Sequence, residues 1–243
     1  MKNINDYDIV SCQEYCKQLP FFNQLLHDFD ELRWEKQFKN EYLNLLITPR
    51  EQYGIGYQVL TKKVFVTVPF FYLRKLLEKN PDTIYDLGCG WNIFKKYIPN
   101  IIGVSPTHNI DHHGDIHDVV DVDYIKNHQN YFESVFSINA LHFRPLNDLK
   151  NIVNEFVSMV KPAGRGFLSL NLMRLIERTS DEFLIEEFGN QTPSVIDYDN
   201  YIRSIISQIN VNYLIVDVDL TVIDEYMDGN IRLVFEKHGD INE

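Results

Sequence analysis

The most informative segment of the chain is Ile84-Tyr85-Asp86-Leu87-Gly88-Cys89-Gly90. Its first four residues predict a short strand, and this strand runs directly into a G-x-G turn. Glycine has no Cβ, so the backbone of such a turn can approach a ligand closely. The carboxylate of Asp86, which precedes the first glycine, would repel a dinucleotide pyrophosphate. The stretch therefore predicts a strand that ends in a binding turn for a cationic ligand.

Further short apolar runs follow this turn and alternate with amphipathic segments. The predicted strands are Ile101–Val104, Ser134–Ile138, Gly166–Leu170, Tyr213–Val216 and Ile231–Phe235, and the predicted helices include Leu149–Val160 and Tyr201–Ile209. Strands separated by helices indicate a parallel sheet with right-handed crossovers. The last two strands lack an intervening helix, so we expect an antiparallel hairpin at the sheet edge, with a turn at Asp228-Gly229-Asn230. The fold class is α/β.

Residues 1–80 differ in composition and hydrophobic pattern from residues 81–243. The first region is aromatic and amphipathic, and it predicts a helical N-terminal cap; the second predicts the core domain. Pro69 suits the first turn of a helix that we expect to run to Lys79. Two interpretations stay open for the aromatic residues of the cap, a mobile lid or ordinary packing: Tyr53, Tyr57, Phe70, Phe71 and Tyr72.

The charge and the cysteines narrow the class of protein. The chain has 243 residues, 23 Lys+Arg against 35 Asp+Glu and a formal net charge of −12, which disfavours nucleic acid as a partner. The three cysteines, Cys12, Cys16 and Cys89, are too few for a disulfide framework. No apolar stretch has the length of a membrane span or a signal core. We expect a cytoplasmic protein without a membrane partner.

Asp86-Leu87-Gly88-Cys89-Gly90 resembles the first motif of the class I, Rossmann-like S-adenosylmethionine-dependent methyltransferases, an acidic residue followed by G-x-G. The resemblance covers about residues 83–237. It implies a doubly wound, mainly parallel, seven-stranded sheet with an antiparallel C-terminal hairpin. It also implies that S-adenosylmethionine is the cofactor. Asp86, Gly88, Cys89 and Gly90 would bind it, chiefly at its amino acid end.

The same resemblance assigns the rest of the cofactor site. Family members usually end the second strand with an acid that binds the ribose hydroxyls, and this chain has Ser105 there. Asp111 is a substitute candidate for that role. Asp115 and Ile116 correspond to the residues beside the adenine, and Asn139 to a residue between cofactor and substrate. Ser105 is the most serious departure from the family pattern.

His142 lies just after the strand that ends at Ile138. It is a candidate general base, because the pKa of histidine lies near neutrality; the alternative is a helix-start residue without chemistry. The Asn/Asp-Pro-Pro-aromatic tetrapeptide of nucleic-acid amino-methylating members is absent here. The resemblance therefore implies a methyltransferase with a small-molecule or protein acceptor. The alternative is a catalytically silent methyltransferase-like binding protein or partner subunit, and Ser105 favours it.

A histidine-rich stretch is the competing candidate for a functional site. It contains imidazoles and carboxylates, which are good ligands for zinc, iron or manganese: His108, Asp111, His112, His113, Asp115, His117 and Asp118. Their spacing does not match a helical zinc motif, and Gly114 argues against one continuous helix. We therefore predict solvated loop residues and no metal.

Overall fold

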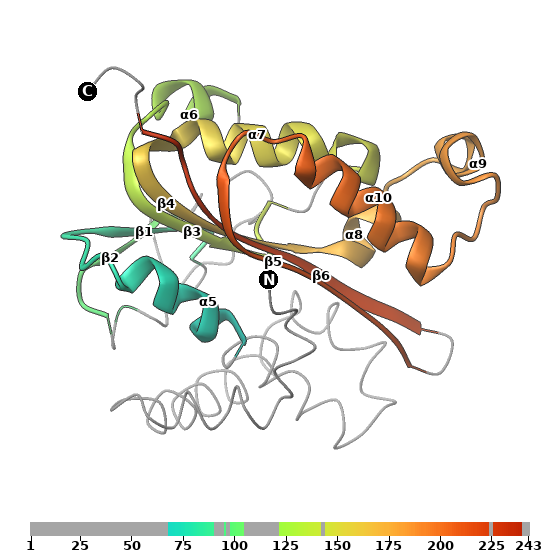
Figure 1. Cartoon of the computed structure of the whole chain (residues 1–243), viewed down its shortest axis with the longest axis horizontal. Coiled ribbons are helices and arrows are strands. Elements are labelled where there is room, and N and C mark those ends of the chain that lie inside the picture. The colour runs from blue at the N-terminus through green and yellow to red at the C-terminus, as the bar shows by residue number, and fades with distance from the viewer. Residues whose placement is uncertain are drawn as a thin grey trace, which may run out of the picture.

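The computed structural model of the protein describes residues 68–89, 95, 98–104, 122–141, 144–223 and 226–239. Within these residues, six strands form one sheet in the order β2-β1-β3-β4-β6-β5 (Figure 1). The strands are β1 (Ile84–Leu87), β2 (Ile101–Val104), β3 (Phe132–Ile138), β4 (Val160–Asn171), β5 (Asn212–Ile223) and β6 (Tyr226–Glu236). β2, β1, β3 and β4 are parallel neighbours, whereas β6 pairs antiparallel with both β4 and β5.

The helices lie on both faces of this sheet. α6, α7 and α10 cover one face, and α5 lies on the other (Figure 1). The helical elements are α5 (Val68–Leu77), α6 (Val122–Asn127), the 3-10 turn η6 (Leu146–Asp148), α7 (Leu149–Met159), α8 (Leu172–Ile176), α9 (Asp181–Phe188) and α10 (Val195–Ser207). None of the helices in these ranges is both long and apolar enough to cross a bilayer.

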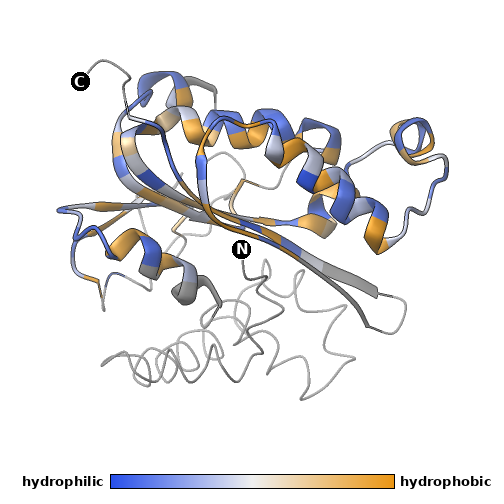
Figure 2. Cartoon of the chain, in the orientation of Figure 1, coloured by the Kyte–Doolittle hydropathy of each residue, from blue (hydrophilic) through white to orange (hydrophobic). Residues whose placement is uncertain are grey.

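The main core lies between the sheet and the helices α7 and α10. Leu168 and Leu170 of β4 point to this side of the sheet and join Leu233 of β6 in the core. α7 supplies Ile152 and Phe156, which lie one helical turn apart on the same face, as the helix period requires. Apolar and polar bands alternate along both helices in Figure 2. The even positions of β4 thus build one face, and its odd positions face α5.

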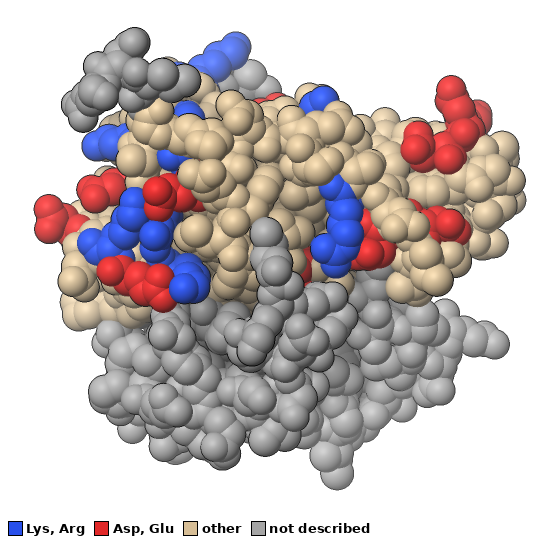
Figure 3. All heavy atoms as spheres, viewed as in Figure 1, with Lys and Arg blue, Asp and Glu red and all other residues tan. Residues whose placement is uncertain are grey.

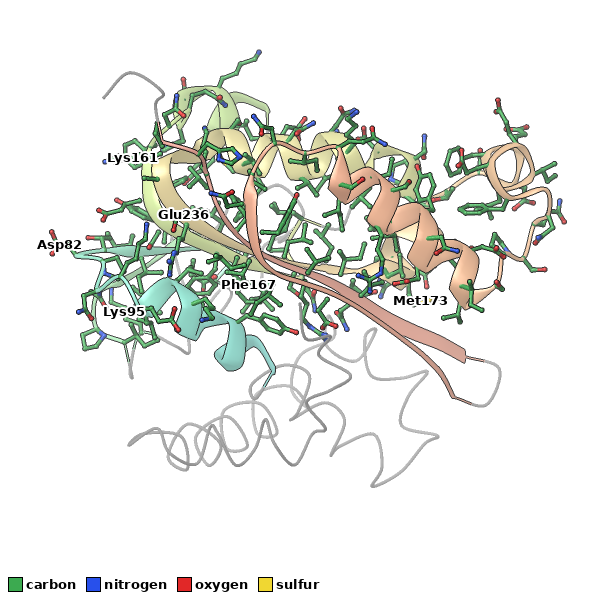
Figure 4. All side chains as sticks on the ribbon, viewed as in Figure 1. Asp82, Lys95, Lys161, Phe167, Met173 and Glu236 are labelled. Carbon is green, nitrogen blue, oxygen red and sulfur yellow. The ribbon has the colours of Figure 1, made fainter. Side chains whose placement is uncertain are left out.

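A hydrogen bond, an ion pair and a stacked pair of rings hold α5 and the residues after it against the opposite face of the sheet. The guanidinium of Arg165 donates to the backbone oxygen of Lys75 over 2.7 Å, and Lys79 lies 2.9 Å from a carboxylate oxygen of Glu236. Tyr72 of α5 stacks on Phe167 of β4 with ring centroids 5.2 Å apart. Figure 3 shows basic and acidic side chains gathered at this end of the molecule, and Figure 4 labels Phe167 and Glu236 close to α5. These contacts attach α5 and the residues after it to β4 and β6.

The predicted α/β class, the mainly parallel sheet and the antiparallel C-terminal hairpin are confirmed. The resemblance implies seven strands, whereas the sheet has six in the described residues. Residues 1–67 of the predicted cap lie outside the described residues. The division into a cap and a core therefore remains a prediction.

Two local predictions are wrong. Asp228-Gly229-Asn230 lies inside β6, because the hairpin ladder continues outward to the pair Ile223–Tyr226. The helix expected from Tyr201 begins earlier, at Val195, where the Ser194 hydroxyl and the Asp197 carboxylate form a capping box. By contrast, α7 ends at Met159, next to the predicted stop at Lys161-Pro162-Ala163-Gly164. The four residues of the predicted stop belong to β4, at the point where the pairing of β4 with β3 shifts register.

Candidate functional site at the carboxyl ends of β1 and β3

The G-x-G turn leaves the carboxyl end of β1 and is held against β2. Gly88 has φ of 82°, a left-handed conformation that a residue with a Cβ adopts only with strain. The amide groups of Gly88 and Cys89 both donate to the Val104 oxygen, over 2.8 and 3.1 Å. The turn therefore needs glycine at position 88, and its backbone is fixed by the end of the neighbouring strand.

Asp86 lies just before this turn, on the side of the sheet that faces α5. Its register partners are Gly103 of β2 and Phe136 of β3, and only 3% of the residue is exposed. Desolvation raises the pKa of the Asp86 carboxyl to about 8. A cation placed beside the carboxylate would favour its charged form and lower this pKa. The site is thus suited to an ammonium group.

Asn139 follows the carboxyl end of β3 and is tied to β4. It has φ of 54°, which asparagine tolerates better than most residues. Its backbone N–H donates to the Ser169 oxygen over 2.8 Å, and the Ser169 hydroxyl donates to Asn139 Oδ1 over 3.1 Å. One residue before the end of β3, the Ser137 hydroxyl donates to the Leu87 oxygen over 2.8 Å. These bonds fix the end of β3 relative to both of its neighbours.

The strand order places both strand ends at a topological switch point. From β1 the chain passes to β2 on one side, and it then returns to β3 on the other side of β1. In open α/β sheets, the crevice outside the carboxyl ends of two such strands is the usual ligand-binding position. Asp86, Gly88, Cys89 and Asn139 lie at these two strand ends. The structure brings together the four predicted site residues that it describes.

The remaining predicted site residues lie outside the described residues: Gly90, Ser105, Asp115, Ile116 and His142. The substitute candidate Asp111 and the whole histidine-rich stretch also lie outside them. Their roles therefore remain predictions. In the ranges that the structure does describe, there is no group of three or more histidine, cysteine or acidic side chains positioned to hold a metal.

Sequence reasoning missed a buried polar cluster on the face of the sheet that packs against α5, called the α5 face below. Tyr72 Oη donates to Asp217 Oδ2 over 2.8 Å, and the Arg232 guanidinium donates to the same oxygen over 2.7 Å. The Arg232 guanidinium also lies 5.9 Å from the centre of the Tyr72 ring. Tyr72 is completely buried, so for this residue the packing interpretation holds and the lid interpretation does not. The available signal was the alternation of polar residues along the last two strands.

Comparisons with known proteins give only weak structural similarity. No family model matches the chain, and no curated protein matches it. Among solved structures, it is similar to the N-methyltransferase NodS from Bradyrhizobium japonicum, with 9% identity, a TM-score of 0.39, and coverage of 70% of this chain and 93% of that chain.

It is also similar to a SAM-dependent methyltransferase from Archaeoglobus fulgidus, with 13% identity, a TM-score of 0.39, and coverage of 74% of this chain and 99% of that chain. Such TM-scores are too low to identify a function. A function must therefore be inferred from the strand order and from the residues at the switch point.

Proposed function

We propose that this chain is an S-adenosylmethionine-dependent methyltransferase with a small-molecule or protein acceptor. The observation that carries the proposal is the placement of Asp86. Its desolvated carboxyl lies beside a glycine turn with a positive φ, at the switch point of an open parallel sheet. A carboxyl in that position needs a cation to stabilise its charged form.

The residues at the switch point fit the amino acid end of this cofactor. Asp86 would accept from the cofactor's ammonium group, and Gly88 leaves room because it has no side chain. The backbone at Cys89, and that at Gly90 by resemblance, would lie against the same end. Asn139 would line the side of the crevice toward β4, where Ser169 orients its amide. By resemblance, Ser105 would face the ribose, and Asp115 and Ile116 the adenine.

When bound, S-adenosylmethionine supplies an electrophilic methyl group on a sulfonium. The protein's contribution to such a transfer is alignment of the acceptor with the methyl carbon and exclusion of water. A base is needed only to remove the proton that the acceptor loses, and His142 is the candidate for it. The fixed backbone of Gly88 and Asn139 suits the alignment role, because both residues are tied to neighbouring strands.

Isothermal titration calorimetry with S-adenosylmethionine and S-adenosylhomocysteine tests the proposal. We expect both to bind, and we expect binding to be lost in Gly88→Arg while the far-UV circular dichroism spectrum is unchanged. The absence of binding to either ligand would refute the enzyme hypothesis. Retained affinity in a folded Gly88→Arg would show that the binding site lies elsewhere.

A catalytically silent binding protein is the second candidate, and Ser105 is the residue that favours it. A serine has one hydroxyl and no charge, so it would bind the ribose hydroxyls more weakly than an acid. This candidate predicts cofactor binding without transfer of a radiolabelled methyl group. Methyl transfer by the wild type therefore separates the two candidates, and Ser105→Asp should strengthen S-adenosylhomocysteine binding if the ribose lies there.

A further inference from the structure

Polar side chains cross the α5 face of the sheet from the switch point toward its far edge. The register places Ser169 of β4 opposite Arg232 of β6, and Arg232 opposite Asp217 of β5. Each of these three residues is at most 2% exposed. The opposite face of the same strands is apolar, with Leu168 and Leu233 in the core. The polar row is therefore buried on a face where apolar packing would be the ordinary arrangement.

Most of this row is satisfied by hydrogen bonds within the protein. Ser169 donates to Asn139, and Arg232 and Tyr72 both donate to Asp217. These bonds compensate for the removal of the groups from water. The row is therefore a line of hydrogen-bonded polar side chains on the sheet that begins beside Asn139 and ends at β5.

Asn230 differs from Asp217 and Arg232, which are bonded to each other although Asp217 Oδ1 and Arg232 Nη2 make no hydrogen bond among the described residues. The residue is 3% exposed, and its Oδ1 atom is buried with no hydrogen-bond partner among the described residues. Its register partner on β4 is Asn171, whose own Oδ1 accepts from the Arg174 N–H as the N-cap of α8. A buried acceptor without a donor lowers stability, so an apolar residue would be preferred at this position for folding alone.

The position of Asn230 relates it to the proposed methyl-transfer site. Asn171 is the last residue of β4, so Asn230 lies at the same edge of the sheet as the carboxyl ends of β1 and β3. β6 is two strands away from β3 in the sheet order. Neighbouring strands are about 4.8 Å apart, which places Asn230 about 10 Å from the end of β3 along the edge.

We infer that Asn230 Oδ1 accepts a hydrogen bond from an N–H or O–H group of the methyl acceptor, at the end remote from the transferred methyl. This inference rests on the proposed function and narrows it. The acceptor is a small polar amine or alcohol, long enough to span about 10 Å between the switch point and Asn230. Asn230 is a specificity-determining residue, because an analogue without the donor leaves a buried oxygen unsatisfied.

The first test is the stability of the unliganded protein with two matched variants. Asn230→Leu removes the unpartnered amide oxygen, and Asn100→Leu removes an amide that donates to the Pro81 oxygen over 2.8 Å. We expect Asn230→Leu to leave Tm unchanged or higher and Asn100→Leu to lower it by several degrees. A fall in Tm for Asn230→Leu would mean that its amide is structural, and it would overturn the inference.

The second test measures ligand-induced shifts in Tm with tyramine, histamine, dopamine and ethanolamine at millimolar concentration. Each is added with and without saturating S-adenosylhomocysteine. We expect at least one of the longer three to raise the Tm of the wild type and to have no effect on Asn230→Leu. No shift in the wild type with any of the four would overturn the assigned class of acceptor. An equal shift in both proteins would overturn the role of Asn230.

Failure of the proposed function is distinguishable from failure of this inference. S-adenosylhomocysteine alone reports on the cofactor site, and we expect equal affinity in the wild type and Asn230→Leu. If neither protein binds S-adenosylhomocysteine, the methyltransferase proposal fails. Asn230 is then judged by the titrations without cofactor. If both proteins bind it, the amine titrations alone decide the inference.

Discussion

Tyr72 Oη donates a hydrogen bond of 2.8 Å to Asp217 Oδ2, although the two residues are 145 positions apart in the chain. The bond joins α5 to β5, the last strand of the sheet. The Tyr72 ring also stacks on Phe167 of β4. One side chain of α5 therefore reaches both the centre and the edge strands of the α5 face.

Tyr72→Phe tests the contribution of this bond. The variant keeps the stacked ring and removes a donor to a buried carboxylate, so we expect a loss of about 1.5–3 kcal/mol in the free energy of unfolding. Chemical denaturation measures it. Tyr131→Phe is the control, because that residue is 48% exposed and its change should cost less. Equal losses in the two variants would contradict the assignment.

Gly88→Ala is expected to weaken cofactor binding more than tenfold, in addition to a strain cost of about 1–2 kcal/mol at φ of 82°. Gly189→Ala is the matched control. Gly189 ends α9 with φ of 76°, and an added Cβ there meets no atom of the described residues within 4 Å. We expect the control to lose similar stability and to bind S-adenosylmethionine normally. Equal affinity in the two variants would contradict the role of Gly88 in the site.

Asp86 predicts a pH dependence of stability. The ordinary pKa of an aspartate is 3.8 and that of the buried Asp86 is about 8, so between these values the folded state holds a proton that the unfolded state has lost. The free energy of unfolding therefore falls as the pH rises from about 4 to about 8. Asp86→Asn should abolish this fall and be more stable near pH 8, by an amount on the order of 2–5 kcal/mol. Parallel stability profiles for the two proteins would contradict this pKa.

Cofactor binding should also release protons from Asp86. An ammonium group beside the carboxyl lowers its pKa, so at pH about 7 a proton leaves as S-adenosylmethionine binds. Calorimetry in two buffers of different ionisation enthalpy measures the number released. Asp86→Asn should bind more weakly and release fewer protons than the wild type. The same release in both proteins would mean that Asp86 does not meet the ligand.

Gly166→Ala should destabilise the core by about 1–3 kcal/mol. An added Cβ would lie 2.5 Å from a ring carbon of Phe235 and 3.0 Å from one of Phe156. Gly239→Ala is the control, since a Cβ there has no neighbour within 4 Å in the described part of the chain. Thermal unfolding of both variants tests the prediction. An unchanged Tm for Gly166→Ala would show that the two rings repack without loss.

Much of the fold follows from local patterns in the chain. The short, mainly apolar runs at Ile84–Leu87 and Ile101–Val104 give the first two strands with the predicted bounds, because the strands of a parallel sheet are covered on both faces. The turn expected at Asp228-Gly229-Asn230 fails for a tertiary reason. These residues favour turns in isolation, but the paired strand β5 holds them in an extended ladder.

The candidate site likewise has residues that the sequence predicted and residues that it did not. The strand and the glycine turn made Asp86 and Gly88 recognisable, since a carboxylate before G-x-G is a local pattern with a physical purpose. Asn230 had no such pattern. Polar residues at alternate positions of a strand look the same whether that face meets water or the protein interior.

Local sequence patterns were enough to predict the α/β class, the glycine turn after β1 and the acidic residue that precedes it, because these depend on neighbours along the chain. Which residues meet at the carboxyl edge of the sheet depends on how the strands are ordered in space. The tertiary structure joined the ends of β1 and β3, paired Asp217 with Arg232, and left Asn230 buried with no donor from the described residues. These relationships depend on strand order and burial, which no single segment encodes.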